Sequence, residues 1–141
     1  MRSIALRFGI LAVLAMGAVG CGGNANDLAV GECFDPPAEI EGTVTDVVKH
    51  SCTEAHGAEV VFVGDFSPAT DTYPASFQAF YSSACTPAFN TYTGLDFSSD
   101  TTYDMAAFKP TSESWGTGDR RVICYAIRID EAKMNASIKK S

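Results

Sequence analysis

Cysteine is the residue type in this sequence that offers the most chemistry. The chain has five cysteines in 141 residues: Cys21, Cys33, Cys52, Cys85 and Cys124. Thiolates bind metals and act as nucleophiles, whereas cysteines in small exported domains usually pair as disulfides. A structural metal site needs close ligand pairs such as C-x-x-C, and this sequence has none. We therefore predict two disulfides, and among the three possible connectivities we favour Cys33–Cys52 and Cys85–Cys124.

Two histidines, His50 and His56, lie on either side of Cys52 in the sequence. His50, His56 and Glu59 could be drawn together with Cys52 as a metal site. If Cys52 is in a disulfide, its sulfur is neither a metal ligand nor a thiolate for His56 to activate. We therefore expect no metal and no cofactor. The alternative is an extracytoplasmic enzyme or metal-binding protein centred on His56 and Glu59.

The remaining catalytic motifs give little support to an enzyme. Residues 137–140, Ser-Ile-Lys-Lys, match the S-x-x-K pattern of serine–lysine enzymes, but the S-D-N and K-T-G partners of that pattern do not occur. The sequence also has no G-x-S-x-G nucleophile elbow, no phosphate-binding glycine loop and no calcium-binding loop. We therefore predict that the protein has no catalytic residues.

A tryptophan lies in a glycine-rich stretch near the C-terminus. Trp115 is followed by Gly116, Gly118, Asp119 and Arg120. Such a tryptophan suits either an interface anchor or a loop that folds over the edge of the core, and we favour the loop. The residues kept as candidates for partner binding are His56, Glu59, Trp115 and Arg120.

The N-terminal segment has the pattern of an export signal. Arg2 and Arg7 precede an apolar run, 8–19, which is too short to span a bilayer. Residues 18–21, Ala-Val-Gly-Cys, resemble a bacterial lipobox, in which the cysteine becomes lipidated. We expect residues 1–20 to be a signal peptide and a lipid on Cys21 to anchor the protein, extracytoplasmically, to a bacterial membrane. An ordinary secretory signal and an uncleaved anchor are the alternatives.

The composition is that of one globular domain. The formal net charge is −7, 46% of residues are hydrophobic and 19% are charged, which is too apolar for a disordered chain. A basic stripe that could neutralise phosphates is missing, so nucleic acid is not an expected partner.

Residues 21–27 are small and polar and predict a lipidated tether. An acidic domain should be repelled by an anionic leaflet and stand off the lipid.

The elements that would position these residues follow from hydrophobic periodicity. Strand patterns occur at 28–34, 42–52, 58–66, 103–108 and 121–129. An apolar stripe with helical spacing predicts a helix over 74–92, and Pro87 predicts a break or kink after Ala84. We expect a turn-rich loop at 111–119 and a loosely held tail from residue 130. The predicted fold is α+β: a small, mostly antiparallel sheet with one helical segment packed on one face and two disulfides.

Three blocks of sequence, in order along the chain, carry a resemblance to one family. Residues 30–34 resemble V-G-D-C-F, with Glu32 in place of the aspartate, and residues 47–60 resemble V-x-x-x-x-C-x-x-x-H-x-x-E-V. Cys85 and residues 115–124 resemble a later cysteine and the block W-x-x-G-D-R-x-V-x-C. These patterns are similar to those of the septum-formation domain family of bacterial exported and membrane-anchored proteins. The resemblance covers residues 28–138 and leaves 139–141 as a tail.

The resemblance implies an extracytoplasmic, disulfide-bonded module associated with cell division, and it carries over no catalytic residues. We therefore expect a non-catalytic, lipid-anchored envelope domain that binds a protein or cell-wall partner in septum formation. A purely structural role in the envelope is a third hypothesis, beside the enzyme or metal-binding alternative.

Overall fold

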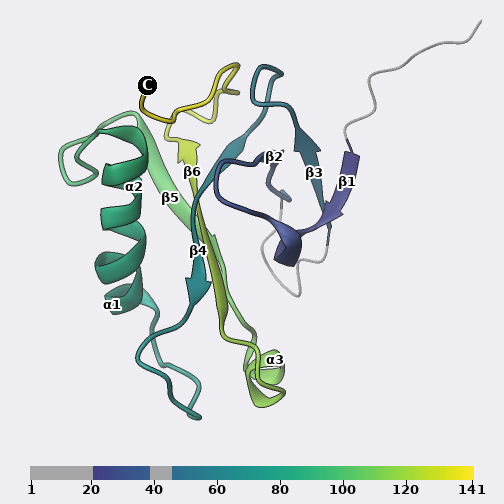
Figure 1. Ribbon diagram of the computed structural model, residues 1–141, viewed down its shortest axis with the longest axis vertical. Helices are drawn as coiled ribbons and strands as arrows, with labels where there is room; N and C mark the ends of the chain where they lie inside the picture. Colours follow the sequence, from purple (N-terminus) through teal and green to yellow (C-terminus); the bar gives the residue numbers. More distant parts are fainter. Residues whose placement is uncertain (1–20, 39–45) are drawn as a thin grey trace, which may run out of the picture.

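The centre of the molecule is a six-stranded antiparallel sheet (Figure 1). The computed structural model describes residues 21–38 and 46–141. The strands are β1 (Cys21–Asn24), β2 (Cys33–Asp35), β3 (Asp46–His50), β4 (Ala58–Asp65), β5 (Tyr103–Phe108) and β6 (Arg121–Arg128). Their order across the sheet is β1-β3-β2-β4-β6-β5, and all neighbouring strands are antiparallel. The two edges of the sheet are therefore β1 and β5.

The two central strands, β4 and β6, have apolar side chains on both faces. Successive side chains of a strand point to opposite faces, so neighbouring residues such as Val122 and Ile123 enter different cores. On β4 the pairing register shifts between Val60 and Phe62, which is a bulge at Val61. Both faces of the central strands are consequently covered, which explains why their sequences are nearly continuous apolar runs.

Each face has its own hydrophobic core. One core lies between the central strands and the N-terminal part of the chain, and it contains Leu28, Phe34, Val47 and Tyr125. The other lies under the helix and contains Phe77, Phe80, Phe89 and Trp115. The predicted fold class, an α+β fold with the helical segment on one face of an antiparallel sheet, is confirmed.

The helical segment is continuous from Gln78 to Thr93. It consists of α1 (Gln78–Phe80), η2 (Tyr81–Cys85) and α2 (Thr86–Thr93), and η2 is a turn of π-helix. A break or kink was expected after Ala84; the helix does not break there, because a wider π turn accommodates Pro87. The Thr86 N–H bonds the carbonyl of Tyr81, five residues back, so the turn before the proline is enlarged and relieves its clash with the preceding turn. Gly94 ends the helix with a φ of 74°.

The disulfide pairing predicted from the sequence is confirmed. Cys33–Cys52 joins β2 to the segment that follows β3. Cys85–Cys124 joins the helix to β6 and lies in the core under the helix. Each disulfide therefore connects elements that are distant in sequence but adjacent in the fold.

The expected tether is part of the domain. Residues 21–24 form β1, which pairs with β3 so that Cys21 lies opposite Lys49 and Asn24 opposite Asp46. Residues 25–27 form a turn of 3-10 helix, η1 (Ala25–Asp27), and Ala25 is buried. Small polar composition alone predicts a flexible linker, but backbone pairing with β3 needs no large side chains. Residues 1–20, expected to be a signal peptide, lie outside the described residues, as do residues 42–45 of the second expected strand.

Two further expectations need correction. The stretch predicted as a loop at 111–119 contains a short helix, α3 (Ser112–Gly116), which begins with a capping box between Thr111 and Ser114. The first expected strand, 28–34, is a strand only from Cys33 onward, because Leu28 caps η1 and Val30 and Gly31 form a turn before β2. Within the described part of the chain, no helix has the length and apolar character needed to cross a membrane.

Candidate functional site

Glu59, a candidate partner-binding residue, is fully buried on β4 and holds the C-terminal segment. Its Oε1 accepts hydrogen bonds from the hydroxyls of Tyr92 at 2.5 Å and Ser137 at 2.7 Å. Its Oε2 accepts one from the backbone N–H of Ile138 at 2.9 Å. These donors satisfy the carboxylate inside the protein, as a buried charge requires. Glu59 therefore anchors the tail and presents no surface to a partner.

Tyr92 is a donor in this cluster rather than a base. Burial, together with the hydrogen bond to Glu59 and the charge of that carboxylate, raises the pKa of Tyr92 to about 12. Its hydroxyl is therefore protonated at physiological pH and can donate to Glu59. The cluster keeps its protons in place and has the character of a structural hydrogen-bond network.

His56 lies just before β4, where the C-terminal segment meets the sheet, and is also fully buried. Its Nδ1 lies 2.7 Å from the carbonyl of Glu54, and its backbone N–H and C=O pair with those of Met134 at 2.9 and 2.8 Å. Its Nε2 has no hydrogen-bond partner among the described residues. The backbone of His56 thus holds the tail, and its ring is not exposed to solvent.

The tail is therefore docked, and the expectation of a loosely held segment from residue 130 is wrong. Met134 is buried, and Lys140 donates its backbone N–H to the carbonyl of Tyr92. Polar composition suggested a free tail, but its backbone groups find partners on β4 and α2. Figure 1 shows this segment passing beside the end of α2.

Within the described part of the chain, His50 and His56 are not gathered with Cys52 and Glu59 into one set of ligand atoms. Ligand atoms of Cys33, Cys52 and Glu59 lie within 4.8 Å of one another, and this is the cluster found among the described residues. Both sulfurs are bonded to each other, so neither is a thiolate. His50 is directed elsewhere, with Nε2 2.9 Å from Oδ2 of Asp35. The chemistry of this donor set is that of a disulfide beside a satisfied carboxylate.

An ionic cluster around Asp35 is a feature that the sequence did not reveal. Asp35 accepts hydrogen bonds from Lys133 and from the backbone N–H of Gly57. It also accepts one from Nε2 of His50 when that nitrogen carries a proton. Partial burial acts to raise the pKa of Asp35, but the hydrogen bonds and positive charges of Lys133 and His50 outweigh it and lower that pKa. Lys133 is distant in sequence, so no local pattern could have identified this cluster.

Trp115, in α3, and Arg120, which follows this helix, pack at the end of the core. Trp115 is 3% exposed and its Nε1 donates to the carbonyl of Asp71 at 3.0 Å. The guanidinium of Arg120 lies 3.8 Å from the centroid of the Trp115 ring and donates to the Trp115 carbonyl. With the indole covered in this way, it is not available as an interface anchor.

The serine–lysine pattern at residues 137–140 has a structural role as well. Ser137 donates its hydroxyl to Glu59 and accepts the backbone N–H of Lys139. The side chain of Lys140 packs beside Gly94 at the end of the helix. The two side chains that the motif would pair are thus engaged with other parts of the fold.

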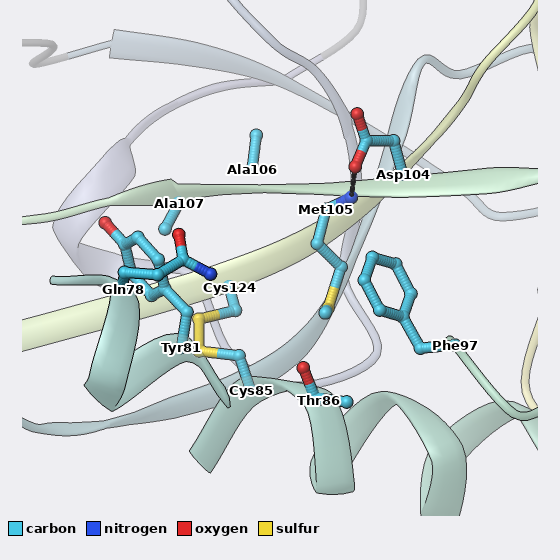
Figure 2. A pocket seen from close by; sticks show the side chains of 10 residues that line it. All are labelled: Gln78, Tyr81, Cys85, Thr86, Phe97, Asp104, Met105, Ala106, Ala107 and Cys124. Carbon is cyan, nitrogen blue, oxygen red and sulfur yellow. Dashed lines mark hydrogen bonds between the residues drawn. A yellow bond between two sulfur atoms is a disulfide. The ribbon is translucent and has the colours of Figure 1, made fainter. Parts of the chain in front are cut away.

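A pocket lies between the helix and the edge strand β5. Its volume is about 200 Å³. Figure 2 shows that the Cys85–Cys124 disulfide lies at its base, with Tyr81 and Thr86 on the helix side and Met105 and Phe97 on the other. No local sequence pattern indicates this pocket, because its lining comes from four segments that the fold brings together: the helix, the loop after it, β5 and β6.

These features define a class of protein: a small, two-disulfide α+β domain whose prominent polar residues hold the scaffold together. The sequence model of the family described as "Septum formation" matches residues 30–141. The chain therefore belongs to the septum formation family, which confirms the resemblance and indicates a role in cell division. No curated protein and no solved structure matches the chain.

Proposed function

We propose that the protein is a non-catalytic, lipid-anchored domain of the bacterial envelope that binds a protein or cell-wall partner during septum formation. The observation that carries this proposal is the family match over residues 30–141. Septum formation is an event of the cell envelope, and a disulfide-bonded domain suits the oxidising compartments outside the cytoplasm.

The state of the acid–base residues supports a binding role over catalysis. His56 and Glu59 are both 0% exposed, and Glu59 is already bonded to three donors. A general base must reach the proton that it abstracts, directly or through one water. In this conformation neither residue can reach a substrate without release of the C-terminal segment.

The position of Cys21 supports anchoring through one edge of the sheet. Cys21 is the first residue of β1, and β5 is the opposite edge, five strand spacings away. Neighbouring strands are about 4.8 Å apart, so a lipid on Cys21 would hold β5 roughly 24 Å from the anchored edge. Because β1 replaces the expected tether, the anchored domain would lie close to the membrane with β5 directed away from it.

Localisation in dividing cells tests the proposal. The full-length protein carries a fluorescent tag after Ser141, which is exposed, and is compared with Cys21→Ala and with Gly22→Ala. Gly22→Ala is a matched control, because a methyl group at this position meets no atom within 4 Å. We expect mid-cell enrichment for the wild type and the control, and its loss for Cys21→Ala. Uniform envelope signal in all three would contradict a role at the septum.

Lipidation and partner binding need separate measurements. Metabolic labelling with a palmitate analogue should mark the wild type and Gly22→Ala but not Cys21→Ala. Cross-linking in intact cells, followed by purification through the tag, should recover the same partner in replicate experiments. Absence of the label would remove the anchor from the proposal, and absence of a reproducible cross-link would remove the partner.

A further inference from the structure

The outer side of β5 has backbone groups that no strand of the described residues covers. The carbonyl of Thr102 accepts from Ile129 at 3.0 Å, so Thr102 faces the β6 side, as do the residues two and four positions later. Tyr103, Met105 and Ala107 then direct their N–H and C=O groups away from β6. An edge of this kind is a template for pairing with another extended chain.

Two carboxylates cap part of this edge. The backbone N–H of Tyr103 donates to Asp100 at 2.7 Å, and that of Met105 donates to Asp104 at 2.8 Å. Figure 2 shows the Asp104 carboxylate turned back onto the Met105 nitrogen. These are side-chain caps rather than strand pairs, so an incoming strand can replace them and release a negative charge. The outward N–H of Ala107 has no such side-chain cap among the described residues.

The pocket above the disulfide lies directly beside this edge. Met105 and Ala107 belong to the face that packs toward the helix, and both contribute to the pocket lining. Ala106 and Ala107 are small, so their side chains add little bulk beside the β5 backbone. A volume of about 200 Å³ is below the usual range for small-molecule sites of roughly 300–1,000 Å³, which suits single side chains of a larger partner.

We propose that an extended, basic segment of a partner protein adds to the free edge of β5 and places an apolar side chain in the pocket above Cys85–Cys124. The inference rests on the proposed binding function and names the chemistry of the partner. Side chains of an added strand alternate between the two faces. Apolar side chains would enter the pocket, and the lysine or arginine residues between them would meet the carboxylates of Asp104 and Asp100.

Charge argues for a basic segment over a second copy of this chain. The net charge of the protein is −7, and pairing β5 with the β5 of another copy would bring acidic residues of the same edge together. A lysine or arginine instead compensates the carboxylate that leaves the backbone N–H. Association should therefore weaken as salt concentration rises.

The test uses a labelled heptapeptide in which lysine alternates with valine, titrated into the full-length protein purified in detergent. The matched peptides have glutamate in place of lysine, or a methyl group on the central backbone nitrogen. The protein variants are Ala107→Pro, Asp104→Asn and Asp46→Asn. Proline is tolerated where an N–H faces outward from an edge strand, so Ala107→Pro blocks pairing without removing a β5–β6 bond. Asp46 is exposed on β3, distant from β5, and serves as the charge control.

We expect the lysine peptide to bind and to shift the NMR signals of the Tyr103, Met105 and Ala107 amides. Ala107→Pro and the N-methylated peptide should each weaken binding by about tenfold, because each removes a backbone hydrogen bond. Asp104→Asn should weaken it several-fold and reduce its salt dependence, and Asp46→Asn should have no effect. The N-methylated peptide keeps the test valid if Ala107→Pro does not fold.

The inference is overturned if the lysine peptide does not bind, if the glutamate peptide binds as tightly, or if N-methylation has no effect. A reproducible cross-linked partner combined with any of these results would leave the proposed function standing and remove only this site. Failure of both experiments would remove the proposed binding function itself.

Discussion

The hydroxyl of Tyr92 on α2 lies 2.5 Å from Oε1 of Glu59 on β4, and this contact links the helix to the sheet. The same carboxylate binds Ser137 and Ile138, so one buried charge connects the helix, the sheet and the C-terminal segment. Removing one partner of a buried charge destabilises the folded protein, because the remaining hydrogen bonds compensate its desolvation less completely.

Tyr92→Phe removes one donor from this carboxylate and leaves the ring in place. We expect the free energy of unfolding to fall by about 1.5–3 kcal/mol, the usual value for a hydrogen bond to a charged group. Chemical denaturation followed by the fluorescence of Trp115 measures this change. Tyr125→Phe is the matched control, since the Tyr125 hydroxyl is buried without a partner among the described residues. Equal destabilisation by both substitutions would contradict the role given to Glu59.

Glu59→Gln tests whether the carboxylate holds the tail. In the variant, an NH₂ group replaces one carboxylate oxygen and faces donors that bond to that oxygen in the wild type. Buried polar groups are then left unpaired, which costs about 1–3 kcal/mol. The Ile138 amide should then exchange with solvent faster than in the wild type, while amides of central β6 change in proportion to global stability. Unchanged exchange at Ile138 would show that the tail is held by other contacts.

The parts of the fold that follow a local pattern were predictable from the sequence. The residue range expected for β5 matches the structure, and the ranges for β4 and β6 differ by one residue at an end, because β-branched and aromatic residues cluster between clear breaks. The apolar stripe predicts the helix, but Pro87 does not interrupt it, because the enlarged π turn before the proline keeps the helix continuous. The disulfide pairing followed from the expected adjacency of strands and helix.

The sequence could not reveal relationships that only the tertiary fold creates. His56 and Glu59 were recognised as noteworthy residues, but their partners Met134, Ser137 and Ile138 are some eighty residues away and carry no local signal. The free edge of β5 was equally hidden, because strand order is a property of the whole sheet. A residue type indicates which reactions a side chain could perform, but its burial decides whether a substrate or partner can reach it.

Alkaline pH should destabilise the protein through two tyrosines. The pKa of Tyr125 is raised to about 12 by burial and by the charge of Tyr81, and that of Tyr92 to about 12 by burial and by Glu59. A raised pKa means that folding favours the protonated form. This contribution to stability is complete below the unfolded value of about 10 and is lost as pH rises through about 12.

Denaturation midpoints between pH 9 and 12, combined with tyrosinate absorbance, check this expectation. The wild type should lose stability over the interval, and Tyr125→Phe should reduce the slope. Tyrosinate absorbance that rises fully near pH 10 in the folded protein would contradict the shifted pKa values.

The two disulfides should contribute unequally to stability. Cys33–Cys52 spans 19 residues and Cys85–Cys124 spans 39. The loop-entropy relation gives about 3 kcal/mol for the shorter loop and about 4 kcal/mol for the longer one. Replacing Cys85 and Cys124 together by alanine should therefore lower the unfolding midpoint more than the same change at Cys33 and Cys52. The opposite order in urea denaturation would show that packing around Cys33–Cys52 outweighs loop length.

Gly94 ends the helix in a conformation that other residues adopt at a cost. Its φ is 74°, and a Cβ at this position would lie 3.0 Å from Cδ of Lys140. Gly94→Ala should therefore lower the free energy of unfolding by about 1–2 kcal/mol, the penalty for an L-residue in the left-handed region. Gly116→Ala is the matched control. Position 116 lies in α3, and a Cβ there meets no atom within 4 Å, so we expect little change or a small gain.

Thermal unfolding of the two alanine variants beside the wild type separates these effects. A lower midpoint for Gly94→Ala alone supports the left-handed cap, and equal midpoints for the two variants would refute it. The Lys140→Ala variant removes the contact with the new Cβ but leaves the backbone conformation unchanged. If strain in the backbone causes the loss, Gly94→Ala should destabilise the Lys140→Ala protein by a similar amount, and if the side-chain contact causes it, the loss should disappear.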